Sequence, residues 1–391
     1  MNKPLKVLHL LGGGKSIGGV EKMLLNYYSR IDRSKIVFDF CFYRENTFGT
    51  VYDEYRDVLN ASRIFELKAF NQESGLIGYL RTIPKVNRLI KENGYQVVHI
   101  NAGRPPLLIS GLIAAWLAGA RVRMVHSHST KGKDGRDFLG ATAYNIVAAF
   151  IKPLLRNMST NLLGCSTEAG KYMFGDKVVA THKYSPIHNA INVELYRYNT
   201  SIRAKLRSEN GVDDNTLLFG HVGRFSEEKN HLFLIDVFAH IHKQIPNSKL
   251  WLVGDGDENI KNEIIKKIYS LSLSENVILL GSRKDVNCID QALDAMIFPS
   301  TYEGLSVVLV EAQAAALPVY TSTNISPEHR VTNLVTFLNL KEGAVAWADY
   351  IVKDMSNHTE RKDTIEEVRK NGYDIETEAL SLQKLYLDSV K

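Results

Sequence analysis

The sequence has few of the residues that build cross-linked or membrane-spanning proteins. Three cysteines occur among its 391 residues: Cys41, Cys165 and Cys288. Because they are far apart and odd in number, they argue against a disulfide framework or a zinc site and for a reducing cytoplasm. The longest apolar run, 107–120, has 14 residues and is too short to span a bilayer. We expect no signal peptide, because early lysines and a strand-like run lead directly into glycines.

Short-period repeats and low-complexity segments are also missing, which leaves an ordinary globular protein. Hydrophobic residues make up 45% of the chain and charged residues 23%, enough for an ample core. A length of 391 residues corresponds to two or three domains of usual size.

Strand-like and helix-like segments alternate along the chain, which predicts an α/β architecture with parallel sheets in two Rossmann-type units. Turn residues at 185–192 indicate a domain change, so we expect domains at 1–190 and 191–373. The expected strands are 6–11, 37–42, 96–101, 122–127, 162–165, 217–223, 249–254, 277–280 and 295–299.

Charge divides along the same boundary. Residues 1–204 hold 28 Lys and Arg against 15 Asp and Glu, a net +13, whereas residues 205–391 carry −8. Because the basic residues are scattered without interleaved aromatic residues, we expect no nucleic-acid partner. An apolar stripe over 138–155 with lysines and arginines beside it favours contact with an anionic membrane. Packing of that stripe into the core is the alternative.

Glu303 and Glu311 stand eight residues apart in a stretch that reads as strand, short loop and helix. We expect Glu303 in the loop, with Gly304 and Leu305 at the helix start. Glu311 then lies about two turns further on, on roughly the same face. A helix N-terminus favours a phosphate, and two carboxylates beside it indicate a nucleotide-sugar site. The alternative is a helix with ordinary solvated glutamates.

Two cations follow another buried strand. The strand at 217–223 ends at Gly223, and Arg224 and Lys229 flank the loop before the next helix. Such cations can clamp a diphosphate, Arg through its planar fork and Lys as a point charge. The alternative is a pair of surface charges balanced by neighbouring glutamates.

Two glycine-containing loops complete the pattern. The first leads through Gly18 and Gly19 into a helix over 20–29, and its glycines let a backbone approach a ligand, although a tight turn is equally compatible. Its spacing fits neither a dinucleotide fingerprint nor a Walker loop. The second, Asp255-Gly256-Asp257, we interpret as a tight turn, because no nearby carboxylate or histidine completes a metal shell.

His126 and His128 stand at i and i+2 where the strand 122–127 ends, so side-chain alternation puts both on one face. The carboxyl ends of parallel strands look into the crevice where such sheets bind ligands. With no third metal ligand evident, we favour polarising or positioning a hydroxyl over metal binding. A hydrogen-bonded structural histidine is the alternative for either residue.

Together these segments resemble, in order and over nearly the whole chain, the retaining GT-B glycosyltransferases of family 4. The resemblance implies two Rossmann-like domains that face each other across a donor-binding cleft, with a final helix, about 374–391, returning to the first domain. The motifs that carry it are Gly18 to Glu21, Gly223 to Phe225 with Lys229 and Asn230, Gly254 to Gly256, and Glu303 with Glu311.

Site roles follow from the resemblance. Arg224 and Lys229 would bind the donor phosphates, Glu303 the transferred sugar and Glu311 the nucleotide ribose. His126 would lie near the donor sugar and, with Arg224, Lys229 and Glu303, take part in catalysis; His128 would lie on the acceptor side. The further donor-binding residues implied are Gly18, Gly19, Gly223, Arg283, Gly304 and Leu305, with Arg283 stacking on the base.

The resemblance also implies the reaction: transfer of a hexose or N-acetylhexosamine from a UDP-sugar to a lipid-linked or oligosaccharide acceptor, with retention and without metal or cofactor. We expect a role in bacterial capsule or exopolysaccharide biosynthesis, in the cytoplasm at the inner face of the membrane. Two rivals are a UDP-sugar epimerase on the same fold and a non-catalytic partner subunit. The spacing of Arg224, Lys229, Glu303 and Glu311 argues against both.

Overall fold

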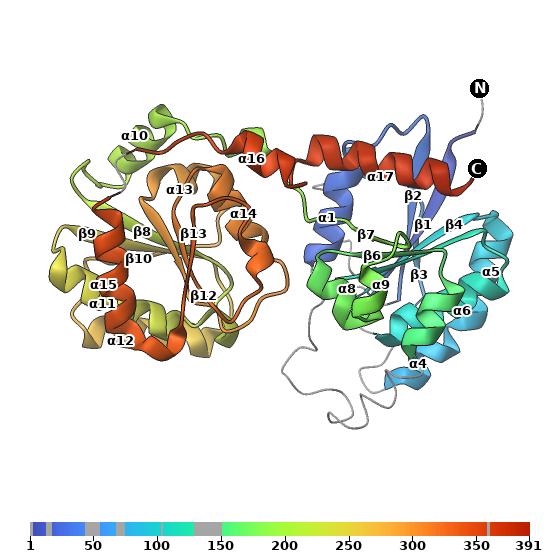
Figure 1. The fold of residues 1–391 in the computed structure, drawn as a ribbon, viewed down its shortest axis with the longest axis horizontal. Helices are drawn as coiled ribbons and strands as arrows, with labels where there is room; N and C mark the ends of the chain where they lie inside the picture. The colour runs from blue at the N-terminus through green and yellow to red at the C-terminus, as the bar shows by residue number, and fades with distance from the viewer. Residues whose placement is uncertain are drawn as a thin grey trace. The chain divides into compact units, whose positions relative to one another are not determined.

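The computed structural model describes residues 3–12, 18–43, 55–67, 75–102, 105–128, 151–357 and 360–391. The chain divides into two compact units (Figure 1). Unit 1 comprises Met1–Ala190 and Ile375–Lys391, and unit 2 comprises Ile191–Asp374.

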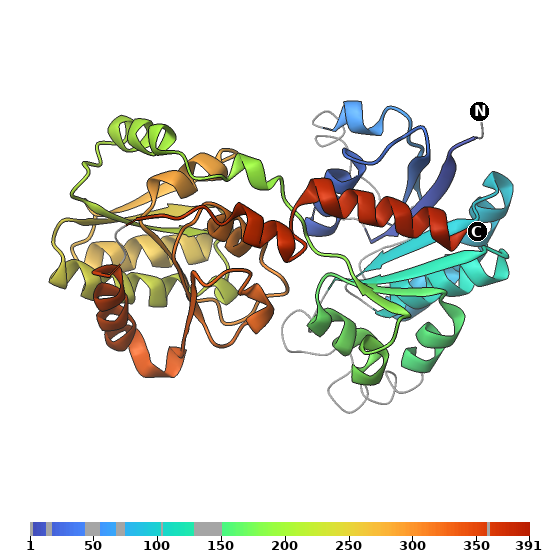
Figure 2. The same ribbon diagram turned by 45° about the horizontal axis from the view of Figure 1, so that its top comes forward.

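Unit 1 is built on a parallel sheet in the order β3-β2-β1-β4-β5-β6-β7. Helices cover both faces, which is why its central strands are apolar on both sides. One face carries α1 (Gly19–Tyr28) and α17 (Ile375–Ser389), which lie side by side in Figures 1 and 2. The other carries α5 (Ile83–Asn93), α6 (Pro105–Leu117) and α8 (Thr167–Phe174). The strands are β1 (Leu5–Leu11), β2 (Ile36–Phe42), β3 (Ile64–Glu66), β4 (Val97–Ala102), β5 (Val122–Ser127), β6 (Asn161–Gly164) and β7 (Tyr184–Pro186), and the shorter helices are α3 (Arg56–Leu59), α4 (Gly75–Arg81) and α9 (Asp176–Val179).

Unit 2 repeats the plan with a parallel sheet in the order β10-β9-β8-β11-β12-β13. Helices α11 (His231–Gln244), α12 (Glu258–Ser270) and α15 (Gly343–Met355) cover one face, and α13 (Val286–Ala292) and α14 (Val307–Ala314) the other. The strands are β8 (Leu217–Val222), β9 (Ser248–Val253), β10 (Val277–Gly281), β11 (Ala295–Phe298), β12 (Val319–Ser322) and β13 (Val335–Leu338), and the remaining elements are α10 (Thr200–Glu209), α16 (Ile365–Lys370), η1 (Val193–Leu195), η2 (Glu227–Lys229), η3 (Pro327–His329) and η4 (Leu340–Glu342).

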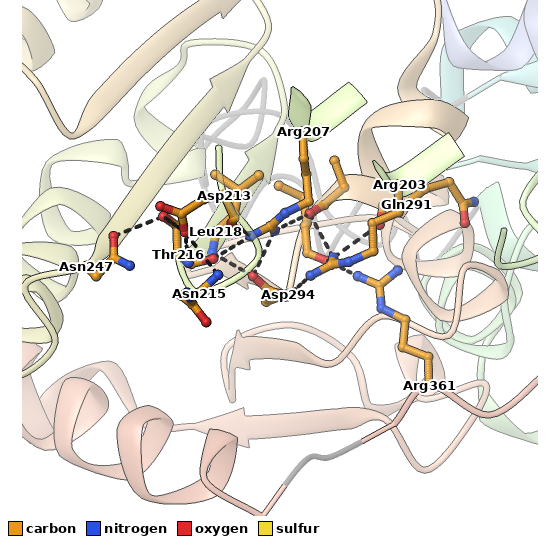
Figure 3. Close-up of polar contacts among 12 residues, drawn as sticks. Arg203, Arg207, Asp213, Asn215, Thr216, Leu218, Asn247, Gln291, Asp294 and Arg361 are labelled. Atoms are coloured by element: carbon orange, nitrogen blue, oxygen red, sulfur yellow. Dashed lines mark hydrogen bonds and ion pairs between the residues drawn. The ribbon is translucent and has the colours of Figure 1, made fainter. Parts of the chain in front are cut away.

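An ion-pair cluster around buried Arg207 ties α10 to the amino ends of β8 and β11 (Figure 3). The Asp294 carboxylate accepts hydrogen bonds from Arg203 at 2.5 Å and from Arg207 at 3.2 Å. It also accepts one from the Leu218 N–H at 2.7 Å. The Arg207 guanidinium also donates through a terminal nitrogen to the carbonyl oxygens of Asp213 and Thr216, whereas its Nε is buried without a partner among the described residues. The side chain is only 1% exposed, so these contacts offset the burial of its charge. This cluster lies at the sheet edge opposite the candidate site and fixes the register of α10 on the sheet.

The two parallel sheets confirm the predicted α/β architecture, and each of the nine expected strands forms within one residue of its predicted ends. The helix predicted to start at Gly304 and Leu305 instead begins at Val307. Ser306 has extended backbone angles and occupies the N-cap position, so Gly304 and Leu305 belong to the preceding loop.

The apolar stripe predicted over 138–155 lies in part outside the described residues. Of the described part, Leu155 is buried in the core of unit 1, and Ile151 and Leu154 pack against the same core. For these three residues the core-packing alternative holds.

Candidate active site

Two loops meet at the carboxyl edge of the unit 2 sheet and bring together two of the predicted residues. Lys229, at the end of η2 after β8, places its Nζ 2.7 Å from Oε1 of Glu303, which follows β11. Each side chain is 13% exposed, so the pair is largely withdrawn from water. Parallel sheets bind ligands at this edge, and here a cation and a carboxylate are held at one point of it.

Backbone contacts between the same loops fix this geometry. The Thr301 N–H donates to the Glu228 carbonyl at 2.8 Å, and the Asn230 side chain donates to the Pro299 carbonyl at 3.3 Å. Asn230 has a φ of 55°, a left-handed conformation that asparagine tolerates better than most residues, and it lets the chain turn directly into α11. Lys229 therefore stands on a rigid turn.

The Lys229 side chain runs over an aromatic floor. Its Nζ lies 4.5 Å from the centroid of the Phe298 ring, a cation–π arrangement, and His221 stacks beneath that ring at 5.1 Å. A Cβ on Gly223 would come within 3.3 Å of Lys229 Cε and 3.0 Å of His221 Nε2. Glycine at this position therefore leaves room for the lysine stem.

The two arginines predicted to bind the donor differ in their ion pairing. Arg224 is exposed and forms no ion pair with the residues that the structure describes, so its guanidinium is available to an anion. Arg283 is held by Asp285 in a two-bond ion pair of 2.8 and 2.6 Å, which raises the pKa of the guanidinium. A nucleotide base that stacks on Arg283 would therefore meet a guanidinium whose orientation is already fixed by Asp285.

The loop before α14 presents backbone donors. Within the described chain, the N–H groups of Gly304 and Leu305 make no hydrogen bond. The next N–H, that of Ser306, donates to Nε2 of buried His329 at 2.9 Å, and His329 Nδ1 lies 2.8 Å from the Ser326 carbonyl. Burial lowers the pKa of His329, which keeps its ring neutral so that Nε2 can accept. The helix start is thus partly capped, and the two preceding amides remain for a ligand.

Glu311 lies one turn into α14, beside Tyr196 and Asp290. Burial, the Glu311 charge and a hydrogen bond to that carboxylate raise the pKa of Tyr196. Burial and the same charge raise the pKa of Asp290 far above its usual range, and neither of its carboxyl oxygens has a hydrogen-bond partner among the described residues. A carboxyl group with a raised pKa and a phenol therefore flank the Glu311 carboxylate.

In unit 1 the glycine loop meets α1. The Gly18 N–H donates to the Glu21 carboxylate at 3.0 Å, so this amide is already occupied. A Cβ on Gly18 would come within 2.8 Å of that carboxylate, whereas a Cβ on Gly19 would meet nothing within 4 Å. Gly19 is the first residue of α1, where N–H groups lack partners within the helix. Of the two glycines, Gly19 fits the expected contact with a ligand better.

His126 and His128 lie together at the end of β5, with ring centroids 3.9 Å apart. Asn101, on neighbouring β4, links His128 to His9 of β1: its oxygen lies 3.3 Å from His128 Nε2 and its amide nitrogen 3.3 Å from His9 Nδ1. Burial lowers the pKa of His9 and of His128 to about 3, and that of His126 well below its usual value. Neutral imidazoles at this edge can donate or accept hydrogen bonds but do not carry charge at pH 7.

The described residues contain no group of three or more His, Cys, Asp or Glu side chains arranged to hold a metal ion. In the Asp255-Gly256-Asp257 loop, Asp257 caps α12 and Asp255 pairs with Lys261. A Cβ on Gly256 would lie 2.3 Å from the Phe225 carbonyl oxygen, so the loop is as tight as predicted.

Sequence reasoning did not single out His221, His329, Tyr196 or Asp290, although each shapes the site. His221 stands in an otherwise apolar strand just before Gly223, and that polar interruption is a usable signal. The other three come close to Glu303 or Glu311 only through the fold, from segments with no motif of their own.

Comparison with known proteins places this fold in a class. A crystal structure of Anabaena Alr3699/HepE in complex with UDP matches with a TM-score of 0.77 at 20% identity and covers 98% of this chain and 100% of that one. The two parallel-sheet Rossmann-like units define a GT-B protein.

Sequence comparison identifies the family. The profile of "Glycosyl transferases group 1" matches residues 202–371. The putative glycosyltransferase EpsF of Bacillus subtilis is 32% identical over 385 residues, covering 97% of this chain and 96% of that protein. An Escherichia coli UDP-Gal:alpha-D-GlcNAc-diphosphoundecaprenol alpha-1,3-galactosyltransferase is 25% identical over 348 residues, 84% of each chain. This chain belongs to the group 1 glycosyltransferases and is a transferase enzyme.

Proposed function

We propose that this enzyme transfers a hexose or N-acetylhexosamine from a UDP-sugar to a lipid-linked or oligosaccharide acceptor in bacterial surface polysaccharide biosynthesis. It retains the anomeric configuration, as in family 4, and needs no metal ion or other cofactor. The observation that carries the proposal is the junction of Lys229, Glu303 and the Gly304–Leu305 amides at the carboxyl edge of unit 2.

The departing group is a nucleoside diphosphate, which gains negative charge as its bond to the anomeric carbon breaks. Lys229 and exposed Arg224 supply two positive charges, and the Gly304 and Leu305 amides supply N–H donors. Such fixed charges and dipoles stabilise a developing anion without reorganising during the reaction. Glu303 then contacts the transferred sugar and Glu311 the ribose, flanked by Tyr196.

Retention follows if the acceptor enters on the face from which the diphosphate leaves. The departing phosphate oxygen takes the acceptor hydroxyl proton, and the new glycosidic bond forms as the old one breaks. This pathway asks neither glutamate to act as a nucleophile. It suits Glu303, whose carboxylate is engaged by Lys229 at 2.7 Å.

Several features of unit 1 support an acceptor at an anionic membrane. Helices α4, α5 and α6 pack together, and on them Ile77, Leu80, Trp116 and Leu117 are between 39% and 64% exposed. Exposed Lys85, Arg88 and Lys91 stand on α5, one of these three helices. Basic side chains next to exposed apolar and tryptophan side chains are typical of surfaces that lie in a lipid interface. Among the described residues, no helix is both long and apolar enough to cross a membrane. The E. coli relative is named for a diphosphoundecaprenol-linked acceptor.

Nucleotide release from a panel of UDP-, GDP- and ADP-sugars, with and without membrane lipid extract and with EDTA present, tests the proposal. We expect release from one UDP-sugar, stimulated by the lipid fraction and indifferent to EDTA, with the product in the donor's anomeric configuration. Abolition by EDTA would contradict metal independence. Interconversion of UDP-sugars without an acceptor would show an epimerase, and absence of both release and UDP binding would show a non-catalytic subunit.

A further inference from the structure

A continuous chain of hydrogen bonds connects the C-terminal helix of unit 1 to the candidate active-site histidine. The Tyr386 hydroxyl, on α17, lies 2.6 Å from His99 Nδ1 on β4. His99 Nε2 lies 3.2 Å from His126 Nδ1 on β5. All three side chains are 0% exposed, so water does not compete for these contacts.

The protons in this chain can be assigned by counting donors and acceptors. Burial lowers the pKa of His99 and His126 well below the usual value, so each ring carries one N–H at neutral pH. Within the described residues, His99 Nδ1 is the one hydrogen-bond partner of the Tyr386 hydroxyl. If Tyr386 donates to Nδ1, then His99 carries its proton on Nε2 and donates to His126 Nδ1. His126 must then carry its own proton on Nε2.

The opposite assignment is less favourable. If His126 Nδ1 donated to His99, and His99 to the phenol oxygen, the Tyr386 hydroxyl proton would be buried without an acceptor. His126 Nε2, which has no partner among the described residues, would also be an unprotonated nitrogen that accepts no hydrogen bond. Two polar groups would be unsatisfied instead of one, and each buried polar group without a partner is unfavourable.

We propose that Tyr386 and His99 are positioning residues that fix His126 in the Nε2–H tautomer, so that Nε2, which is buried without a partner among the described residues, presents a hydrogen-bond donor, and not a base, to a substrate oxygen that reaches it. The substrate group this donor fits is a sugar hydroxyl or a phosphate oxygen, both of which accept hydrogen bonds. The tautomer assignment stands on unit 1 alone, whereas its consequence for turnover rests on the proposed transfer function.

Long-range ¹H–¹⁵N correlation spectra of the full chain, with ¹⁵N-labelled histidine, measure the tautomers directly. A His126→Gln variant assigns the His126 signals by their loss. We expect His126 to be protonated at Nε2 in the wild type, and to become a mixture of tautomers in Tyr386→Phe. Tyr28→Phe is the matched control, because the Tyr28 hydroxyl is buried in the same core without a partner among the described residues. An Nδ1–H tautomer in the wild type, or an unchanged His126 spectrum in Tyr386→Phe, would overturn the proposal.

Turnover with the donor found in the panel supplies a second readout. Tyr386→Phe should lower kcat about tenfold, roughly the effect of losing one hydrogen bond in the transition state, with KM within about twofold. His99→Gln, which can accept through its oxygen and donate through its nitrogen, should restore more activity than His99→Leu. Equal losses in His99→Gln and His99→Leu would contradict the positioning role. If no donor is turned over, the spectra still decide the tautomer, so failure of the two proposals can be distinguished.

Discussion

Lys229 Nζ and Glu303 Oε1 lie 2.7 Å apart, in an ion pair of which each side chain is 13% exposed. One partner is the cation proposed to bind the donor diphosphate, and the other is the carboxylate proposed to contact the sugar. A bound diphosphate would therefore compete with Glu303 for the same ammonium group. Because of this competition, a substitution of Lys229 and a substitution of Glu303 should affect nucleotide binding differently.

Removing either cation should impair turnover severely. Arg224→Ala and Lys229→Ala each remove a positive charge from the leaving phosphate, and we expect kcat to fall by roughly 100-fold or more. Lys205→Ala, at a side chain 76% exposed on α10, is the control and should leave turnover unchanged. Donor hydrolysis and transfer that survive both cation substitutions would contradict the phosphate assignment.

Glu303→Gln should separate binding from catalysis. Without the carboxylate, Lys229 loses its internal partner, so UDP should bind about fivefold more tightly, equivalent to roughly 1 kcal/mol of lost competition. Transfer should nevertheless fall, because the sugar loses its charged contact. Calorimetric titration with UDP, combined with turnover, measures both; weaker UDP binding in this variant would refute the competition.

Glu311→Ala should mainly weaken donor binding. A hydrogen bond from a ribose hydroxyl to this carboxylate contributes about 1.5–3 kcal/mol, so the donor KM should rise about tenfold or more while kcat changes little. Tyr196→Phe removes a group that hydrogen-bonds Glu311 and should give a smaller rise. A large loss of kcat with an unchanged KM would assign Glu311 to the chemical step instead.

The ion-pair cluster of α10 predicts a large stability effect away from the site. Asp294→Ala leaves Arg203 and buried Arg207 unpaired and should cost about 3–5 kcal/mol. Urea unfolding followed by tryptophan fluorescence reports on unit 2, whose Trp251 and Trp347 are buried. Glu209→Ala, at an exposed pair on the same helix, should change stability by less than about 0.5 kcal/mol. Similar unfolding curves for both variants would contradict a structural role for the cluster.

Acid should destabilise unit 1 through its buried histidines. Burial lowers the pKa of His9 from 6.5 to about 3, so the folded ring stays neutral while the unfolded chain takes up a proton below pH 6.5. The stability from the neutral ring is therefore complete above about pH 6.5 and is lost as the pH falls toward 3. At pH 5 the loss is about 2 kcal/mol for this one histidine. Urea unfolding at pH 7.5 and at pH 5 measures this loss of stability. The His9→Phe variant should take up about one proton fewer than the wild type on unfolding. An unchanged pH dependence of stability in that variant would contradict the lowered pKa of His9.

Apolar runs and glycine punctuation were sufficient to predict the two parallel sheets, because strands buried on both faces leave a strong local signal. The strands that were missed, β3, β7, β12 and β13, have only three or four residues each, which leaves a weak local signal. The start of α14 was misplaced because its cap depends on His329, which is distant in sequence and pairs with Ser306 through tertiary structure.

Within the site, Lys229 and Glu303 could be singled out from the sequence because each follows the end of a strong strand. Their direct ion pair could not, since it depends on the turn at Asn230 and on the Thr301–Glu228 hydrogen bond. Tyr386 is more distant still: it lies 287 residues from His99 in the chain, and a helix pattern gives no sign of which strand residue its hydroxyl meets.

Calorimetric titration of UDP in EDTA, into the wild type, Lys229→Ala and Lys205→Ala, tests the central claim most directly. The proposed site predicts saturable binding to the wild type and to Lys205→Ala, and binding at least tenfold weaker, a loss of about 1.4 kcal/mol, in Lys229→Ala. Equal affinity in all three proteins would show that the diphosphate binds elsewhere and would contradict the assignment of this edge of unit 2 as the donor site.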